Sequence, residues 1–221
     1  MSDLIDQETA PAPAPAPPRN ARSARILEAA RRCFSDKGFR STTIIDIADA
    51  AGVSRPLVYK YFGDKDGLID SALRAVFADW EALNDPDSEV EALPNAPARS
   101  AGVALEEKLR KSVEFVRQQP IFKTILQNDP QIVMRGHLEG LRRCRSVSAA
   151  STRAILEAGA ETGEFRADLD TEAATASVEM ILFGLLERAL GIRPELILEP
   201  DLERTTIDLL LAGLLSPRGI R

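Results

Sequence analysis

The chain has 221 residues, of which 44% are hydrophobic and 28% charged, and its formal net charge is −6. A chain of this length and composition can bury a sizeable core. It contains no run of about 18 apolar residues, and its first twenty residues hold no apolar stretch that could serve as a signal sequence. These features exclude a membrane-spanning protein and favour a cytoplasmic one.

The cysteine and histidine content argues against disulfides and metal sites. The two cysteines, Cys33 and Cys144, lie in no CxxC pair and in no Cys/His cluster, so they offer neither a disulfide framework nor a zinc site. The whole chain holds one histidine. We therefore expect no metal and no cofactor, and a reducing compartment.

The negative net charge hides an uneven distribution. Residues 1–18 carry three acidic side chains, whereas residues 19–65 carry ten basic and five acidic ones, a local net charge of +5. The remainder of the chain is acidic. A basic N-terminal module on an acidic body is typical of a protein that contacts nucleic-acid phosphates with one end only.

An Ala/Pro tract opens the chain. Residues 1–20 contain five prolines between Pro11 and Pro18, which fix φ and remove N–H donors, so a helix is excluded there. We expect a disordered arm. Its basic end, with Arg19 and Arg22, either touches a DNA groove or is simply a solvated leader.

After this arm, apolar residues recur at helical spacing almost throughout, and no strand-like alternation is present. Proline and glycine mark most of the breaks. The fold class is all-α. The expected helices span 22–37, 44–50, a short segment after Ser54, 65–84, 102–119, 121–128, 132–161, 171–191 and 200–215.

Local signals between residues 42 and 62 predict a helix-turn-helix. Thr42 or Thr43 suits the N-cap of the first short helix. Gly52 supplies a left-handed turn. Ser54 is expected to cap the second helix, whose first turn tolerates Pro56 because the missing N–H would be unpaired there anyway.

The residues of this segment divide between an inner and an outer face. Apolar side chains stand where the helices must pack on one another: Ile47, Ala48, Val53, Val58 and Phe62. The outer face of the second short helix carries polar or aromatic side chains at Ser54, Arg55, Lys60 and Tyr61.

These motifs together resemble the TetR (tetracycline-repressor-like) family. The resemblance covers about residues 22–72 and rests on the runs from Thr42 to Ala48, from Ala51 to Ser54 and from Val58 to Phe62, with Lys37-Gly38-Phe39 before them and Lys65 after. After the disordered arm (1–20) that the prolines predict, it implies a three-helix DNA-binding domain (21–66) and a helical domain for dimerisation and ligand binding (67–221).

The resemblance also implies individual roles at DNA. Thr43 would bond a phosphate at a helix N-terminus, and Arg55 would read a base, since guanidinium to guanine is the commonest specific contact in the major groove. The full set of implied contacts is Thr43, Ser54, Arg55, Pro56, Leu57, Tyr59, Lys60, Tyr61 and Lys65. The alternative is that the tyrosines pack in the core and that Arg55 and the lysines only solubilise the surface.

Two positions depart from the family pattern. Ile45 stands where relatives often carry a basic or polar residue that touches DNA. Asp66-Gly67 replaces a Glu-rich first turn, so we expect weaker intrinsic support for the helix that begins there, because glycine in a helix costs about 1 kcal/mol relative to alanine.

The last two long helices carry wide apolar stripes that can serve both the core and a partner. In proteins that this chain resembles, such a pair meets its symmetry mate. We therefore expect a homodimer through these helices, on a roughly palindromic operator whose half-sites lie about 34–36 Å apart.

A ligand pocket in the body is a further hypothesis. Large apolar or polarisable side chains there could line it, although each could equally be plain core: Trp80, Phe115, Phe122, Met134, His137, Cys144, Met180 and Phe183. Because basic residues do not cluster on these helices, we expect a neutral or mainly apolar molecule.

Two other classes of function fit the sequence less well. No metal cluster, GxSxG, GxGxxG or GxxxxGK[ST] occurs, so the sequence offers nothing from which to build an enzyme. A helical adaptor for another protein suits the acidic body but not the basic N-terminal module. The sequence does not distinguish repression from activation, although repression is the usual mode of the family that it resembles.

Overall fold

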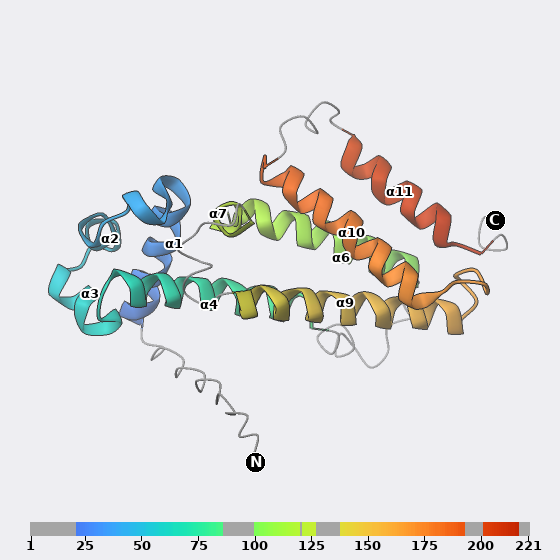
Figure 1. Cartoon of the computed structure of the whole chain (residues 1–221), viewed down its shortest axis with the longest axis horizontal. Helices are drawn as coiled ribbons and strands as arrows, with labels where there is room; N and C mark the ends of the chain where they lie inside the picture. Colours follow the sequence, from blue (N-terminus) through green and yellow to red (C-terminus); the bar gives the residue numbers. More distant parts are fainter. Residues whose placement is uncertain (1–20, 86–99, 120, 127–137, 193–200, 217–221) are drawn as a thin grey trace, which may run out of the picture.

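A computed structural model describes residues 21–85, 100–119, 121–126, 138–192 and 201–216 (Figure 1). The described residues are α-helical apart from turns. The helices are α1 (Ala21–Ser41), α2 (Ile44–Ala51), α3 (Arg55–Phe62), α4 (Lys65–Leu83), α6 (Ala101–Gln118), α7 (Ile121–Leu126), α9 (Leu138–Glu161), α10 (Thr171–Ala189) and α11 (Leu202–Leu214).

The first three helices form a compact head, at the blue end of the chain in Figure 1. Helix α1 is kinked at Gly38, where φ is 76° and ψ 166°, so the regular helix stops there as the sequence predicts. Phe34 and Phe39, on either side of the kink, are buried with their ring centroids 5.1 Å apart. This kink turns the chain toward α2.

The body consists of α4, α6, α7, α9, α10 and α11. Helix α4 runs from the head into the body and packs against both α1 and α9. Helix α6 is central, because it contacts α9, α10 and α11 as well as α4 (Figure 1). The long helix α4 is therefore the covalent connection between head and body, and both α4 and α7 pack against α1.

The C-terminal end of α11 is tied to the turn after α9. Phe165 and Leu215 form an isolated antiparallel bridge, in which Arg166 N–H donates to the Leu214 carbonyl at 3.0 Å and Ser216 N–H to the Glu164 carbonyl at 2.8 Å. The Glu164 carboxylate also accepts from Ser100 and from two N–H groups in the first turn of α6. One short segment thus holds the ends of three helices.

The predicted all-α class is confirmed, and the helix limits agree with the expected ones to within a few residues. The expected arm (1–20), the irregular segment after α4 and residues 132–137 of the expected long helix lie wholly or largely outside the described residues. Within the described part of the chain, no helix is long and apolar enough to cross a membrane, and no group of three metal-ligating side chains occurs.

Candidate functional site

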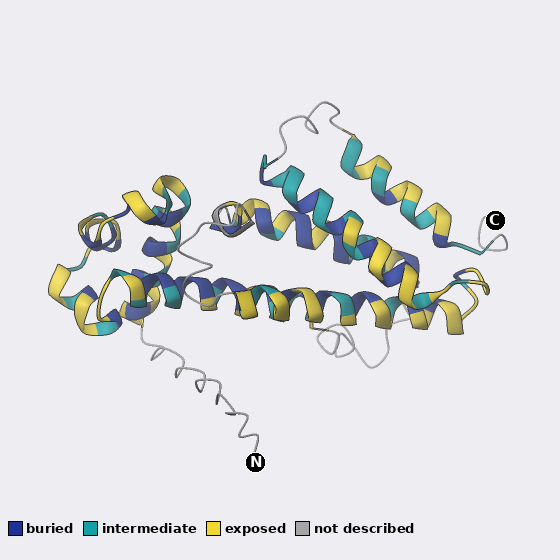
Figure 2. Cartoon of the chain, viewed as in Figure 1, coloured by how far each residue is buried: buried dark blue, intermediate teal, exposed yellow. Residues whose placement is uncertain are grey.

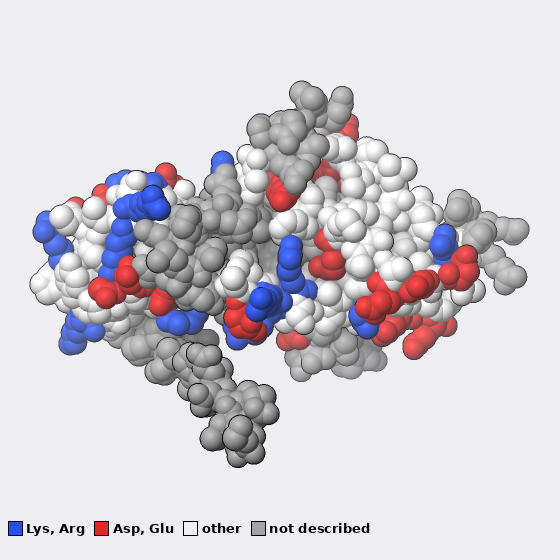
Figure 3. All heavy atoms as spheres, viewed as in Figure 1, with Lys and Arg blue, Asp and Glu red and all other residues white. Residues whose placement is uncertain are grey.

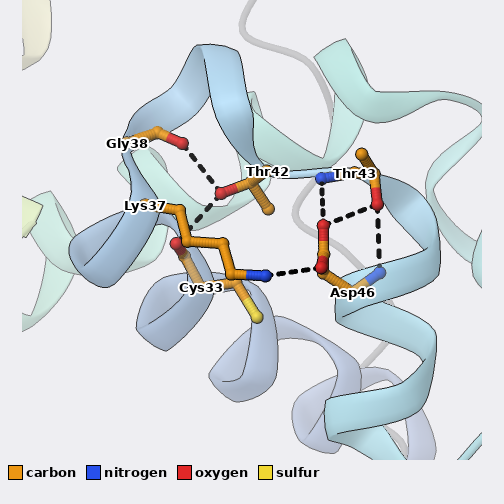
Figure 4. Close-up of polar contacts among 6 residues, drawn as sticks. All are labelled: Cys33, Lys37, Gly38, Thr42, Thr43 and Asp46. Atoms are coloured by element: carbon orange, nitrogen blue, oxygen red, sulfur yellow. Dashed lines mark hydrogen bonds and ion pairs between the residues drawn. The ribbon is translucent and has the colours of Figure 1, made fainter.

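The N-terminus of α2 is closed by a reciprocal capping box (Figure 4). The Thr43 hydroxyl accepts from the Asp46 N–H at 3.2 Å, while the Thr43 N–H donates to the Asp46 carboxylate at 2.8 Å. This arrangement satisfies two backbone donors that a helix end leaves open. Of the two predicted caps, Thr43 is the N-cap; Thr42 is buried, and its hydroxyl donates to carbonyls of α1.

Asp46 also joins α2 to α1. Lys37 Nζ lies 2.5 Å from Asp46 Oδ1 (Figure 4). The hydrogen bond from Lys37, followed by those from the Thr43 hydroxyl and N–H, holds the pKa of the Asp46 carboxyl well below its usual range. Sequence analysis missed this role of Asp46; the signal was a threonine followed three residues later by an acid.

The turn between α2 and α3 contains the left-handed glycine that the sequence predicts. Gly52 has φ 62° and ψ 43°, a left-handed conformation that glycine adopts without strain. Its carbonyl accepts from Arg25 of α1 at 3.3 Å. Local sequence and a contact to α1 therefore both fix the angle between the two short helices.

The start of α3 differs from the expectation in one respect. Ser54 occupies the N-cap position as predicted, but its side chain makes no capping hydrogen bond. Pro56 lies in the first turn, where it needs no N–H donor. The uncommitted, exposed Ser54 hydroxyl thus stays available on the outer face.

Most of the predicted DNA contacts are exposed on the head. Val58 and Phe62 of α3 are buried, so the opposite side of the helix faces outward. The exposed predicted contacts are Thr43, Ser54, Arg55, Pro56, Tyr59 and Lys60.

The remaining predicted contacts are partly buried: Leu57, Tyr61 and Lys65. Lys65 Nζ donates to the Arg40 carbonyl at 3.0 Å, and the Tyr61 ring lies 6.4 Å from that of Phe62. In this state Lys65 holds α4 against the end of α1.

Basic side chains gather over the head, whereas acidic ones gather over the opposite end of the body (Figure 3). This agrees with the +5 balance of residues 19–65. Ile45, 42% exposed, adds an apolar side chain to the same head.

Gly67, expected to weaken the start of α4, has a packing role that the sequence analysis did not predict. A Cβ atom at Gly67 would overlap the carbonyl oxygen of Phe62, and the Gly67 N–H donates to the Asp64 carboxylate at 2.7 Å. Glycine here permits the close approach of α4 to the end of α3, and Asp64 caps the helix. The propensity argument concerned the helix alone and left out this contact with the residue five positions earlier.

Three of the predicted pocket residues form an aromatic cluster in the body. The ring centroids of Trp80, Phe115 and Phe122, from α4, α6 and α7, lie 5.8 to 5.9 Å from one another. Trp80 Nε1 donates to the Cys144 carbonyl of α9 at 3.2 Å. Burial raises the pKa of the Cys144 thiol to about 12, so this thiol is a packing group rather than a nucleophile.

Of the other predicted pocket residues, two lie on α10 and two lie outside the described part of the chain. Met180 is 73% exposed on α10. Phe183 lies under the Arg145 guanidinium, whose carbon is 4.8 Å from the ring centroid. Met134 and His137 lie outside the described residues.

A polar cluster that the sequence did not reveal lies at the meeting point of four helices. Lys108 of α6, 5% exposed, donates to Asn84 Oδ1 at 2.8 Å and to Ser148 Oγ at 3.0 Å. Its Nζ is also 3.9 Å from Glu179 Oε1, which accepts from Thr152 at 2.6 Å. A buried ammonium is tolerable only with such partners.

Arg31 connects head and body. Its guanidinium donates to Asp79 Oδ2 on α4 and to Gln119 Oε1 after α6, both at 2.8 Å. Asp79 adjoins Trp80, and the Gln119 carbonyl accepts from the Phe122 N–H at 3.0 Å. Both partners of Arg31 are thus directly linked to the aromatic cluster.

An open, mainly apolar groove of about 380 Å³ lies between α10 and α11. Its walls include Leu169 and Ala173 on one side and Leu209 and Gly213 on the other. Leu209 is 70% exposed, and much of α11 is exposed or half-buried (Figure 2). These two helices therefore present apolar surface that the described residues leave exposed.

Comparisons with known proteins find similarity both in the head and beyond it. A profile of bacterial regulatory proteins of the tetR family matches residues 26–72. The HTH-type transcriptional repressor KstR2 of Rhodococcus jostii (strain RHA1) is 30% identical over 162 residues, 71% of this chain and 74% of the relative. That similarity extends well beyond the head.

Solved structures show the same fold. PfmR, a TetR family transcriptional regulator from Thermus thermophilus, matches with a TM-score of 0.61 and 25% identity, over 87% of this chain and 100% of its own. The ketosteroid transcriptional regulator KstR2 of Mycobacterium tuberculosis matches with a TM-score of 0.60 and 21% identity, over 91% and 98% of the two chains.

Proposed function

The chain belongs to the tetR family of bacterial regulatory proteins, and from this membership we propose that it represses transcription from a palindromic operator until a small molecule binds its body. As a member of this family it is a DNA-binding transcriptional regulator and not an enzyme.

The exposed start of α3 supports direct base reading by Arg55. Burial of Val58 and Phe62 fixes the roll of α3, and the exposed Arg55, Pro56 and Tyr59 lie on its outer side. Arg55 would bond guanine O6 and N7, and Lys60 would meet the phosphates. This exposed face on a basic head is the observation that carries the proposal.

Thr43 would contact a phosphate only at the expense of its cap. Both its hydroxyl and its N–H are engaged with the Asp46 carboxylate in the free protein. A phosphate at this helix end would take over one of these bonds, while Lys37 keeps Asp46 in place.

The uncovered surface of α10 and α11 supports a homodimer through these helices. Met180 and Leu209 are 73% and 70% exposed, and the groove between the helices is mainly apolar. A second copy would cover it, and the twofold axis would place two α3 helices in successive major grooves.

The ligand would bind at the aromatic cluster. KstR2 of Mycobacterium tuberculosis is named for ketosteroids, and a mainly apolar molecule also suits three aromatic rings of this chain. A ligand that parted Trp80 and Phe122 would shift Asp79 and Gln119, and through them Arg31 of the head. The head would then have two orientations on the body, one that binds the operator and one that does not. The ligand can change operator affinity only if it binds one of these orientations more tightly than the other.

The proposal is tested by selecting duplexes from a random DNA pool with the full-length protein at fixed salt. The variants are Arg55→Ala and, as a matched control, Arg74→Ala. Arg74 is also exposed, but it lies nine residues into α4, about 14 Å along that helix from its start.

We expect the wild type and Arg74→Ala to enrich the same palindrome, and Arg55→Ala to lose or relax one base position at a cost of about 1–3 kcal/mol. Weak retention that falls steeply with salt and enriches no sequence would leave only nonspecific binding. No retention would favour the adaptor function.

A further inference from the structure

The side chain of Ser112 is a buried polar group without a partner. It lies on α6 with 1% of its surface exposed, and its Oγ makes no hydrogen bond. Ser71 and Thr175, buried on α4 and α10, each donate to the carbonyl four residues earlier, at 2.8 and 2.7 Å. An unsatisfied buried hydroxyl costs free energy, so Ser112 needs an explanation, and a ligand atom that bonds its hydroxyl would supply one.

Ser112 lies between the two clusters of the body. It follows Lys108 by four residues and precedes Phe115 by three, so all three side chains share one face of α6. The aromatic cluster stands on one side of Ser112 along the helix, and the buried polar cluster on the other. Such a boundary suits a molecule with an apolar body and one polar atom.

The charged groups near Ser112 favour a ligand whose polar atom is neutral. Lys108 already has a carboxylate within 3.9 Å and two neutral oxygen acceptors at 2.8 and 3.0 Å. A ligand anion would therefore add an uncompensated charge beside Glu179, which is costly in a buried place. A neutral carbonyl oxygen needs only one donor, and the Ser112 hydroxyl has a hydrogen to donate.

We propose that the ligand of this regulator is a neutral ring ketone, whose carbonyl oxygen accepts from Ser112 Oγ while its rings lie against Trp80, Phe115 and Phe122. This inference rests on the proposed ligand-released repressor and adds the chemical class of the ligand. Ser112 is then a specificity residue, and the aromatic rings supply the apolar contact.

Trp80 gives a direct measurement, because it is the single tryptophan of the chain and belongs to the aromatic cluster. Its fluorescence is titrated in the full-length protein with 2-decalone and 5α-androstan-3-one. Decalin and 5α-androstane, the same rings without oxygen, are the matched compounds. The variants are Ser112→Ala and, as control, Ser71→Ala, and thermal unfolding of each free variant is recorded.

We expect the wild type to bind at least one ketone about tenfold more tightly than its hydrocarbon, the value of one hydrogen bond. Ser112→Ala should bind the ketone and its hydrocarbon equally tightly. This variant should also unfold at the same or a higher temperature than the wild type, because it removes an unpaired buried hydroxyl. Ser71→Ala should unfold at a lower temperature and keep the preference for the ketone.

Three results would overturn the inference: no response of Trp80 to either ketone, a ketone preference that persists in Ser112→Ala, or a lowered unfolding temperature of that variant. The last would mean that the hydroxyl has an internal partner. Binding of the selected duplex is measured separately. Duplex binding without ketone binding refutes this inference alone, whereas failure to bind any duplex refutes the proposed function.

Discussion

The Arg31 guanidinium and the Asp79 carboxylate lie 2.8 Å apart and join α1 of the head to α4. The Arg31 side chain is 12% exposed and that of Asp79 48%, so the pair sits at the edge of the interface between head and body. The same guanidinium reaches Gln119 at 2.8 Å. One side chain of the head therefore bonds two separate elements of the body.

Replacing Arg31 should loosen the head on the body. Arg31→Ala removes two charge-assisted hydrogen bonds, and we expect the free energy of unfolding to fall by about 1–3 kcal/mol. The neighbouring exposed Arg32→Ala should change it by less than about 0.5 kcal/mol. Denaturant unfolding measures both.

The same variant tests the proposed coupling. In Arg31→Ala the ratio of operator affinities with and without a bound ketone should approach one, while both ligands still bind. An unchanged ratio would show that coupling does not pass through Arg31.

Gly67→Ala should destabilise the protein, although alanine is the better helix former. The added methyl would overlap the Phe62 carbonyl oxygen, so we expect a loss of about 1–3 kcal/mol, as for overpacking. Ala75→Gly, half-buried in the middle of the same helix, should cost about 1 kcal/mol by propensity alone. A thermal scan that showed Gly67→Ala to be stabilised would refute the close approach.

Met180→Lys should convert the dimer to a monomer. Met180 is 73% exposed on α10, and a lysine there would bury an ammonium group of each protomer in the proposed interface. Leu138→Lys, 41% exposed at the start of α9, is the control and should remain dimeric. Light scattering gives the mass directly; a Met180→Lys dimer would place the interface elsewhere.

The α2 capping box should persist to acidic pH. Hydrogen bonds from Lys37 and Thr43 lower the pKa of Asp46 from 3.8 in the folded state. The unfolded chain therefore binds the proton first as pH falls, and the stability that Asp46 contributes is fully present above about pH 4 and is lost below it.

Asp46→Asn measures this contribution. We expect the difference in unfolding temperature between the wild type and this variant to be constant from pH 7 to about pH 5 and to shrink below pH 4. A difference that grew on acidification would have the opposite sign and would rule out a lowered pKa.

The sequence by itself determined the local structure of the head. Its signals act within a few residues and can be recognised in a short stretch of sequence: the Thr43 cap, the Gly52 turn and Pro56 in the first turn of α3. The exposed face of α3 followed because the spacing of Val58 and Phe62 fixes which side is buried.

Tertiary structure decided what depends on distant residues. Arg31 and Gln119 are 88 positions apart, and Lys108 and Ser148 are 40 apart. Helical periodicity marks a residue as inward-facing but does not name its partner, which is why Trp80, Phe115 and Phe122 meet while Met180 points outward. Gly67 shows a different limit, because the Phe62 carbonyl oxygen that leaves no room for a Cβ atom is only five residues away, yet propensity alone does not reveal it.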